Sequence, residues 1–542
     1  MVEPFTYRPA AVNQLGYPSG SRKNAVFNGY EGSFEIIDLT SGQTVFTGHT
    51  GVPAKDPSTG ANVCKGDFTA LTASGSYRIE HNGRQLSGPF TISGRPYDTL
   101  HDGLLKAFYY FRCGTELTEE YAGPWHHAAC HLADGIVYDQ TERRPDSRGG
   151  WHDAGDYGKY TGPGAKAVAD LLLAYEFYPD AFSRTLPLPE SDGIMPDVLH
   201  ECRWELEFLL KMQDPLTGGV FHKLTTCHFP GIEVMPEDDL AELYFSPVSV
   251  SAAGCFAGVM AMAARVYQPF DTAFAEVCLK AARRAWSWLE QHPDLPGFRN
   301  PAGITTGEYS DEETDDERYW AAAELFRTTG ENQFHQVFAD LSGKAFPKYS
   351  LGWADMGGYG TIAYLLAEEG STDAELRARL LDGLLEETRT LSERANQDGY
   401  FISLGPQDYI WGSSMVVMNN AMLLLIAARL GPAPELEQTA LDHVHYLLGR
   451  NILGISYVTG FGDRAVCHPH HRPSAGDSVD APVPGLVSGG PNAGLNDDIS
   501  RELLAGKAPA ACFIDHVESY ATNEVTIYWN SPAVFVVSRW AG

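Results

Sequence analysis

The stretch PVSVSAAGCFAGVMAMAARVY, residues 247–267, has the composition of a buried helix. It is rich in Ala, Val and Met almost throughout, and Arg265 is its single charged residue. A helix that is apolar on every side must be buried among other elements. We therefore predict an inner helix that is packed on most of its faces.

Amphipathic patterns on both sides of this stretch predict further helices. In residues 197–213, for example, Val198, Leu199, Cys202 and Leu206 recur at helical spacing. The predicted helices lie near residues 98–112, 164–178, 197–213, 247–267, 272–291, 316–329, 332–343, 357–369, 373–393, 413–430, 434–450 and 530–539. About twelve helices fit a toroid of six helical hairpins, although periodicity alone does not close such a toroid. Long connections at 113–163, 214–246 and 451–529 are predicted to carry the chemistry.

The sequence before residue 96 has a different pattern. Short runs rich in β-branched and aromatic residues, at 34–38, 44–46 and 76–79, alternate with turn signals such as Ser41-Gly42. Roughly seven such strands predict a small β-sandwich of immunoglobulin-like type. We place this domain at residues 1–95 and an all-α domain at residues 96–542.

The composition excludes several classes of protein. The 542 residues include 39 Lys and Arg against 70 Asp and Glu, a net charge of −31, with 44% hydrophobic residues. Such a chain can bury a large core, and its acidity argues against nucleic acid and anionic membranes as partners. No run reaches the roughly 18 apolar residues of a membrane span. The first residues lack the basic and apolar regions of a secretory signal. We expect a cytoplasmic protein if this N-terminus is native, and otherwise a secreted protein whose signal was removed.

Two segments place carboxylates among aromatic and small residues. In residues 149–160, GGWHDAGDYGKY, Asp153 and Asp156 lie three positions apart, a pairing suited to general-base chemistry. The alternative is an Asp-rich turn that caps the next helix. In residues 513–531, Glu524 lies among apolar and aromatic neighbours, where burial would keep it protonated as an acid. The alternative there is a Glu held by a structural hydrogen bond.

A third segment, residues 456–473, contains three histidines within four positions. His468, His470 and His471 are ligand types for a metal, but Arg472 beside them would repel a cation. Hydrogen-bond donors to a polyhydroxy ligand are therefore the favoured interpretation.

Metal ligands are predicted at two other places. Cys113, Cys130, His131 and His152 form the Cys2His2 set that structural zinc takes, although the spacing is not that of a zinc finger. A Cys113–Cys130 disulfide is the competing interpretation. The acidic run at residues 311–317 offers oxygen ligands for Ca²⁺, or simply a solvated helix start that complements the helix dipole.

These segments together resemble the signature regions of glycoside hydrolase family 9, a family made mostly of cellulases. The resemblance rests on an aromatic-x-Asp-x4-aromatic-x3-Glu pattern, on a histidine signature and on the Trp151–Asp156 segment. The first is met by Phe513, Asp515, Tyr520 and Glu524, and the second by Ser456, Thr459, Gly462, Arg464, Pro469, His470 and Arg472. The β domain, with VNQLGY at residues 12–17, resembles the immunoglobulin-like domain that precedes the catalytic module in one subgroup. The resemblance spans nearly the whole chain and implies an (α/α)6 barrel and inverting hydrolysis of β-1,4-glucosidic bonds.

The resemblance also implies roles for single residues. Asp156 matches the general base, Asp153 the second carboxylate that helps to hold the water, and Glu524 the general acid. The matches to substrate-contacting positions are His470 and Arg472, with Trp411 and Tyr520 as further candidates. Structural zinc is implied at Cys113, Cys130, His131 and His152, and structural calcium at Glu313, Asp316, Glu317 and Asp355. A second calcium set is predicted at Glu190, Asp192 and Asp197.

We expect a monomeric endo-β-1,4-glucanase acting on cellulose derivatives, mixed-linkage glucan and cello-oligosaccharides. An exo-acting cellodextrinase or glucosaminidase of the same fold is the alternative, because the loops at the ends of the cleft decide between endo and exo action. A zinc-dependent hydrolase is the alternative from another class, but the chain lacks His-Glu-x-x-His and its zinc set has no open position. A non-enzymatic carbohydrate-binding protein would not need the three carboxylates.

Overall fold

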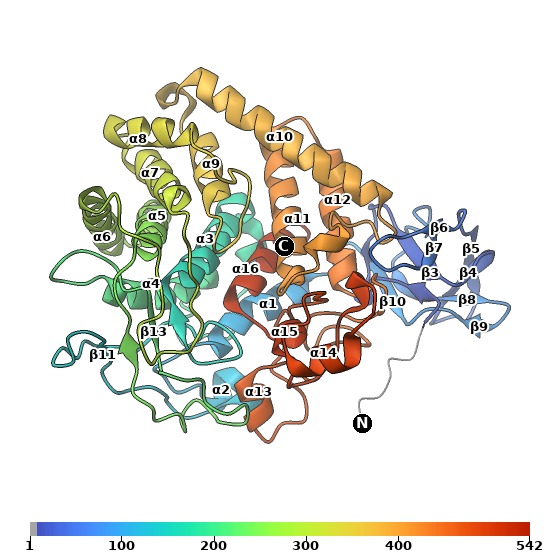
Figure 1. Ribbon diagram of the computed structural model, residues 1–542. Coiled ribbons are helices and arrows are strands. Elements are labelled where there is room, and N and C mark those ends of the chain that lie inside the picture. The colour runs from blue at the N-terminus through green and yellow to red at the C-terminus, as the bar shows by residue number, and fades with distance from the viewer. Residues whose placement is uncertain (1–7) are drawn as a thin grey trace. The chain divides into compact units, whose positions relative to one another are not determined.

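The computed structural model describes residues 8–542, so the prediction made from the first seven residues lies outside the described part. The chain divides into two compact units. Unit 1 comprises Met1–Ala107, Thr388–Ala475 and Val479–Gly542, and unit 2 comprises Phe108–Glu387 and Gly476–Ser478. A β-rich N-terminal part precedes a mostly helical part, as predicted (Figure 1).

The strands of the β-rich part form two sheets. The first has the order β1 (Ala10–Ala11), β3 (Asn24–Asn28), β7 (Asn62–Asp67) and β6 (Ala54–Lys55). The second has the order β2 (Tyr17–Pro18), β10 (Phe90–Ser93), β8 (Gly75–His81), β4 (Ser33–Asp38) and β5 (Thr44–His49), and β9 (Arg84–Gln85) pairs with β8. The strands predicted at 34–38, 44–46 and 76–79 are confirmed as β4, β5 and β8.

One apolar cluster joins the two sheets. Phe27 of the first sheet is fully buried together with Phe34, Ile36 and Ile79 of the second. Across the second sheet, Ile36 of β4 lies opposite Ile79 of β8. Because alternate residues of both sheets enter the same core, the sheets pack face to face as a sandwich.

The twelve predicted helices are all present. They are α1 (Asp98–Tyr110), α3 (Thr161–Phe177), α4 (Asp197–Met212), α5 (Val250–Tyr267), α6 (Thr272–Gln291), α7 (Asp315–Thr329), α8 (Asn332–Ser342), α9 (Gly357–Leu365), α10 (Ala374–Gln397), α11 (Ser413–Leu430), α12 (Glu435–Leu447) and α16 (Ile527–Ser538). The long connections contain four short helices, α2 (Glu119–Ala122), α13 (Arg472–Gly476), α14 (Asp498–Leu504) and α15 (Tyr520–Asn523). These were not predicted, because one turn is too short to show an apolar period.

Helix α5 is the inner helix that its composition predicts. Every residue of α5 except Arg265 is buried, and the helix packs against α3, α6 and α7. Its glycines allow α7 to approach closely: a Cβ at Gly254 would lie 2.5 Å from the Cβ of Glu317, and one at Gly258 would lie 2.8 Å from the ring of Trp320. In unit 1, α11 packs against α12 and α16.

Helices α5 and α11 are long and apolar enough to cross a membrane by length and composition. In the structure, 94% of the apolar window of α5 and 72% of that of α11 are buried inside the protein. Core packing therefore accounts for their composition.

A small sheet in unit 2 was not predicted. Its order is β11 (Ile136–Val137), β14 (Tyr244–Phe245), β13 (Lys223–Thr225) and β12 (Lys159–Tyr160). Strands of two or three residues carry too little alternation to be recognised in a sequence. Strand β12 follows Asp156 closely and pairs with β13, so this sheet fixes one end of the Asp153–Asp156 loop.

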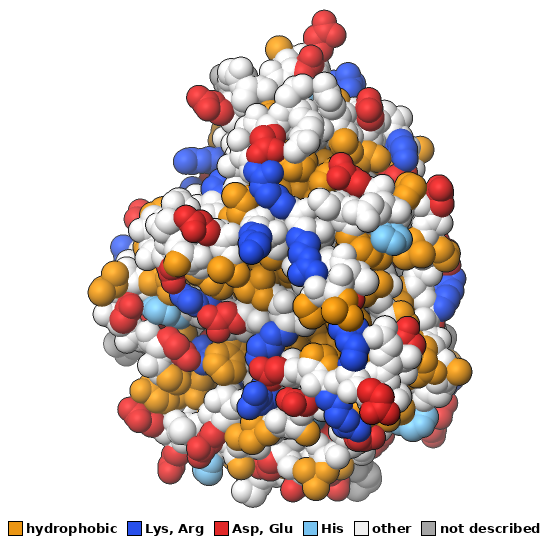
Figure 2. Space-filling model, turned by 90° about the vertical axis from the view of Figure 1, so that its left-hand side faces the viewer, with side chains coloured by type: hydrophobic (Ala, Val, Ile, Leu, Met, Phe, Trp, Pro, Cys, Tyr) orange, Lys and Arg blue, Asp and Glu red, His pale blue; other side chains and the backbone are white. Residues whose placement is uncertain are grey.

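The net charge of −31 does not gather into one acidic field on the face shown in Figure 2. Acidic and basic side chains are interspersed there among apolar ones.

Candidate active site

Asp153 and Asp156 lie on one tight loop of unit 2, and both are buried. The Asp153 N–H donates to the Gly158 carbonyl at 2.9 Å and closes the loop. The Gly158 N–H donates to Asp156 Oδ2 at 2.9 Å, and a Cβ at Gly158 would lie 2.8 Å from that oxygen. The helix that follows, α3, has Tyr160 at its N-cap. The two aspartates are therefore not caps of α3, which removes the alternative interpretation of this segment.

Tyr309 holds one of the two carboxylates. Its hydroxyl donates to Asp153 Oδ2 at 2.6 Å. Its φ of 46° lies in the left-handed region that non-glycine residues rarely adopt. Its ring packs against Tyr160 and Trp353, at centroid distances of 4.6 Å and 4.8 Å. Strain of this kind clusters at functional sites. Tyr309 was not predicted, because no local pattern in the sequence links it to Asp153.

Lys223 adds a buried positive charge that acts on Asp156. Its ammonium donates to the Gly307 carbonyl at 2.6 Å and to Thr306 Oγ1 at 3.1 Å. Burial lowers the pKa of Lys223 to about 8, and the charge of Asp156 opposes that shift. Lys223 thus secures the segment that leads to Tyr309, a second contribution that the sequence did not indicate.

Two glutamates of α4 hold the other end of the loop. Glu205 Oε2 accepts a hydrogen bond from the Trp151 N–H at 2.6 Å, and Glu201 Oε1 accepts one from Trp151 Nε1 at 2.8 Å. Burial raises the pKa of Glu205 to about 8. The loop from Trp151 to Tyr160 is therefore fixed at both ends, by α4 and by β12.

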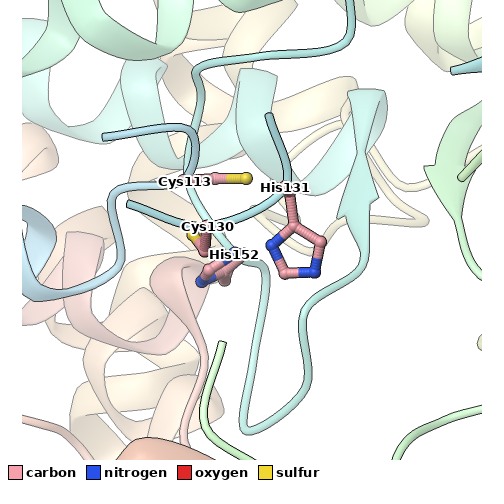
Figure 3. A group of neighbouring side chains, drawn as sticks. All are labelled: Cys113, Cys130, His131 and His152. Carbon is pink, nitrogen blue, oxygen red and sulfur yellow. The ribbon is translucent and has the colours of Figure 1, made fainter. Parts of the chain in front are cut away.

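The predicted zinc ligands come together in unit 2. Figure 3 shows Cys113, Cys130, His131 and His152 gathered, with their ligand atoms all within 4.8 Å of one another. The Cys113 N–H donates to the Gly150 carbonyl at 2.8 Å, which aligns the two segments that carry Cys113 and His152. Both cysteines are free in the structure, so the competing disulfide is not formed.

The chemistry of these four side chains fits a tetrahedral cation. His131 Nε2 lies 3.4 Å from Asp239 Oδ2, an orientation typical of a metal-ligating imidazole. Within the described residues, His131 Nδ1 and His152 Nε2 are buried without a hydrogen-bond partner. Burial raises the pKa of the Cys113 thiol, but the hydrogen bond with Cys130 and the charge of Lys159 hold that pKa well below its usual range. Two cysteines and two unsatisfied imidazoles form the donor set that Zn²⁺ takes in closed sites.

Part of the predicted calcium set lies in one buried acidic cluster, together with a residue that was not predicted. Asp316 and Glu317 begin α7 and are buried together with Asp311. Burial and neighbouring carboxylates raise the pKa of Asp311 to about 7 and that of Glu317 well above its usual range, and the charge of Asp355 contributes at Asp311. Neither oxygen of Glu317 has a hydrogen-bond partner in the part of the chain that the structure describes. Glu313 lies outside this cluster, exposed and bonded to the Asp315 N–H, so Asp311 takes its place.

The buried carboxylates of Asp311, Asp316 and Glu317 are ligand types for a hard cation. Unpaired buried carboxylates need protons or a cation, and Ca²⁺ takes such oxygen ligands. A small pocket lined by Asp311, Glu317, Tyr309 and Trp353, among others, lies beside them.

The carboxylates of the predicted second calcium set have separate protein partners. Glu190 pairs with Arg112 at 2.9 Å. Asp192 accepts the N–H groups of Ile194 and Met195 in an exposed turn. Asp197 accepts the Leu186 N–H at 2.6 Å. These partners account for all three residues, so the structure gives no support to this site.

In unit 1, backbone pairing places Glu524 beside His470. The His470 N–H donates to the Asn523 carbonyl at 2.8 Å, and the Gly489 N–H donates to the Glu524 carbonyl at 2.9 Å. His470 Nδ1 donates to the Val517 carbonyl at 2.6 Å, which leaves Nε2 as an acceptor. Burial lowers the pKa of His470 to about 4, so its ring is neutral.

Asp515 and Asn523 both form hydrogen bonds with the histidine segment, and Asn523 directly precedes Glu524. Asp515 accepts hydrogen bonds from the Cys467 and His468 N–H groups, both at 2.8 Å, and from Asn523 Nδ2 at 2.9 Å. Asn523 Nδ2 also donates to the His468 carbonyl at 2.6 Å. Asp515 is therefore an organising residue of this signature, with both oxygens bonded to protein donors.

The predicted substrate-binding aromatics lie together in unit 1. Trp411 is 40% exposed and Tyr520 36% exposed, with ring centroids 5.3 Å apart. The His470 ring lies 5.9 Å from that of Tyr520. Arg472 is buried at the start of α13. Exposed rings beside a neutral histidine form a surface on which a sugar can stack.

Known proteins resemble this chain over nearly its whole length. Residues 97–537 match the model of glycosyl hydrolase family 9, and residues 6–85 match that of the cellulase N-terminal ig-like domain. A cellodextrinase of Butyrivibrio fibrisolvens is 38% identical, over 97% of this chain and 98% of its own length. A xyloglucan-specific endo-β-1,4-glucanase of Bacteroides ovatus is 34% identical, over 97% and 92%. A solved single mutant of a thermostable endoglucanase from Alicyclobacillus acidocaldarius superposes with a TM-score of 0.93 at 43% identity, covering 98% of this chain and 99% of that one.

Proposed function

The chain belongs to glycosyl hydrolase family 9, and from this premise we propose that it hydrolyses β-1,4-glucosidic bonds with inversion, as an endo-β-1,4-glucanase. The observation that carries the proposal is the loop with two buried carboxylates, Asp153 and Asp156, each bonded to a donor of this chain. In this proposal the helical residues 96–542 are an (α/α)6-barrel catalytic domain, and residues 1–95 are its immunoglobulin-like domain.

Inversion needs a base that deprotonates water and an acid that protonates the leaving oxygen, roughly 6.5–9.5 Å apart. Asp156 is the proposed base. Asp153, whose orientation Tyr309 fixes, shares the water with it. Glu524 is the proposed acid. His470, Arg472, Trp411 and Tyr520 are proposed to bind the glucan, because a neutral imidazole, a guanidinium and exposed rings suit hydroxyl groups and the apolar faces of sugars.

The two metal sites are proposed to be structural. Cys113, Cys130, His131 and His152 would hold Zn²⁺, whose closed coordination would fix the segment between Phe111 and the Asp153 loop. Asp311, Asp316, Glu317 and Asp355 would hold Ca²⁺, which neutralises buried carboxylates when bound.

Exo action on short oligosaccharides is the second candidate. It is favoured by the full-length similarity to a protein named cellodextrinase. An endo-acting enzyme lowers the viscosity of carboxymethylcellulose early, whereas an exo-acting enzyme releases reducing ends with little loss of viscosity.

The test compares viscosity and reducing ends on carboxymethylcellulose, with the product profile from cellopentaose. We expect early loss of viscosity with the parent protein and none with Asp156→Asn, a folded control. Parent protein that releases no reducing ends from either substrate would refute the proposal, and reducing ends without viscosity loss would favour the cellodextrinase.

A further inference from the structure

Gln14 of the β-rich part reaches into the helical part of unit 1. Its Oε1 accepts the Arg464 N–H at 2.7 Å, and its Nε2 donates to the Gly454 carbonyl at 3.0 Å. The Gln14 N–H donates to the Leu448 carbonyl at 2.9 Å. One side chain of the β domain thus ties together both sides of the segment between residues 454 and 464.

Two glycines form the cradle that receives this side chain. A Cβ at Gly449 would lie 2.5 Å from Gln14 Nε2, and one at Gly462 would lie 2.9 Å from Gln14 Oε1. Both glycines have positive φ values, 117° and 125°. Any larger residue would displace the Gln14 amide, so the cradle is built around it.

The anchored segment leads directly to the proposed substrate residues. The backbone of Ser456 pairs with the chain on both sides of Ala465. The Ser456 N–H donates to the Arg464 carbonyl at 2.8 Å, and the Ser456 carbonyl accepts from the Val466 N–H at 3.1 Å. The next residues, Cys467 and His468, are the ones that Asp515 binds. The strand-like run from Arg464 to His470 is therefore held at one end by Gln14 and at the other by Asp515 and Asn523.

We propose that Gln14 is a positioning residue for the histidine segment: through the backbone at Gly454 and Arg464, the β domain sets the place of His470 and Arg472, and so the binding of the glucan. This inference rests on the proposed function for its kinetic consequence. Gln14 itself touches no substrate. Loss of the Gln14 hydrogen bonds should raise KM more than it lowers kcat, because the residues that Gln14 positions bind the sugar and do not transfer protons.

The test uses Gln14→Met in the full-length protein, which keeps the volume in the cradle and removes all the hydrogen bonds of the Gln14 side chain. The control is Gln438→Ala. Gln438 Oε1 accepts the Arg22 N–H at 3.0 Å, so this change removes another hydrogen bond between the β domain and the helices, away from the histidine segment. A second variant, Gln14→Glu, keeps the acceptor for the Arg464 N–H and loses the donor to Gly454.

Two measurements are made on each variant: amide hydrogen exchange across residues 449–472 without substrate, and KM and kcat on cellopentaose. Gln14→Met should speed exchange at Arg464 and Val466 and raise KM about 5- to 10-fold, as expected for one or two lost hydrogen bonds, with kcat within about twofold. Gln14→Glu should restore protection at Arg464 and lower KM part of the way toward the parent value. Gln438→Ala should change neither quantity in this segment.

Unchanged exchange and KM in Gln14→Met would overturn the inference. An equal rise of KM in Gln438→Ala would also overturn it, because the effect would then belong to docking of the β domain in general. If the parent protein proved inactive on glucans, the proposed function would fail by that observation, and the exchange measurement would still decide whether Gln14 orders the segment.

Discussion

At the scale of single residues, three carboxylates divide the proposed chemistry. Asp156→Ala should lower kcat by several orders of magnitude, because no neighbouring base, Asp153 included, replaces it fully. Glu524→Gln should lose most activity on glucan but keep much of it on a dinitrophenyl cellobioside, whose leaving group needs little protonation. Steady-state kinetics on both substrates checks this. Equal losses on the two substrates would contradict the role of Glu524 as the acid.

Inversion itself is checked by the first-formed anomer. NMR of early products from a β-linked substrate should show the α-anomer, because water attacks from the face opposite the leaving group. A β-anomer as the initial product would mean retention and would remove the assignment of Asp156 as a base.

Tyr309 tests whether orientation of Asp153 matters. Tyr309→Phe removes the 2.6 Å hydrogen bond to Asp153 and leaves the ring packing. A hydrogen bond to a charged group contributes about 1.5–3 kcal/mol, so kcat should fall about 10- to 100-fold without loss of fold. Tyr138→Phe is the matched control, since the Tyr138 hydroxyl donates to the Ala302 carbonyl, outside the loop. A parental kcat in Tyr309→Phe would show that the orientation of the Asp153 carboxylate does not depend on this hydrogen bond.

At the scale of elements, the end of α10 carries a buried acid. Burial, and then the charge of Asp56 of the β domain, raise the pKa of Asp398 to about 7. An unfolded Asp titrates near 3.9, so the folded chain binds the extra proton between these values. The contribution of Asp398 to the free energy of unfolding is therefore most favourable below about pH 4 and is lost as the pH rises through about 7.

The corresponding variant is Asp398→Asn. It should be more stable than the parent at pH 8, by up to about 4 kcal/mol as an upper limit, and the difference should shrink toward pH 4. Urea unfolding at pH 5 and pH 8 measures this. The same substitution at exposed Asp139 should leave the pH dependence unchanged. A parent whose stability does not fall over this range would contradict the shift.

The proposed zinc ligands Cys113, Cys130, His131 and His152 would hold the segment that leads to the Asp153 loop. Cys130→Ser should remove bound zinc and lower both the melting temperature and the soluble yield, because metal binding contributes to folding free energy. Activity should fall mainly with the amount of folded protein. Metal analysis of the parent and the variant checks the claim, and parent protein without zinc would disprove it.

At the scale of the whole molecule, calcium is expected to stabilise more than it catalyses. A ligand that binds only the folded chain adds about 2.7 kcal/mol at a hundredfold excess over its Kd. EDTA should lower the melting temperature, and added Ca²⁺ should restore it in the parent but less in Asp316→Ala. Glu313→Ala is the control, because Glu313 lies outside the cluster. Identical melting curves with and without chelator would count against the site.

The helices, the strands and the types of chemical group could be predicted from the sequence. Helices α3 to α12 and strands β4, β5 and β8 were predictable because an apolar period of 3.6 or 2 is local, and each period records which face is buried. The four candidate zinc ligands and the carboxylates were also predicted, from their residue types together with the resemblance to a known family. The short helices and the sheet of β11 to β14 were not predicted, because helices of four to seven residues and strands of two or three residues are too short to show an apolar period.

Which side chains hold those groups in place depends on the tertiary structure. Tyr309 reaches Asp153 across 156 positions of sequence, and Gln14 reaches Arg464 across 450. Asp311, rather than Glu313, is buried with Asp316 and Glu317, whereas Glu313 is exposed to solvent. Such contacts depend on how distant elements pack, and packing leaves no periodic trace in the residues that it brings together. The sequence therefore determined what the groups are, and the fold determined what holds them in place.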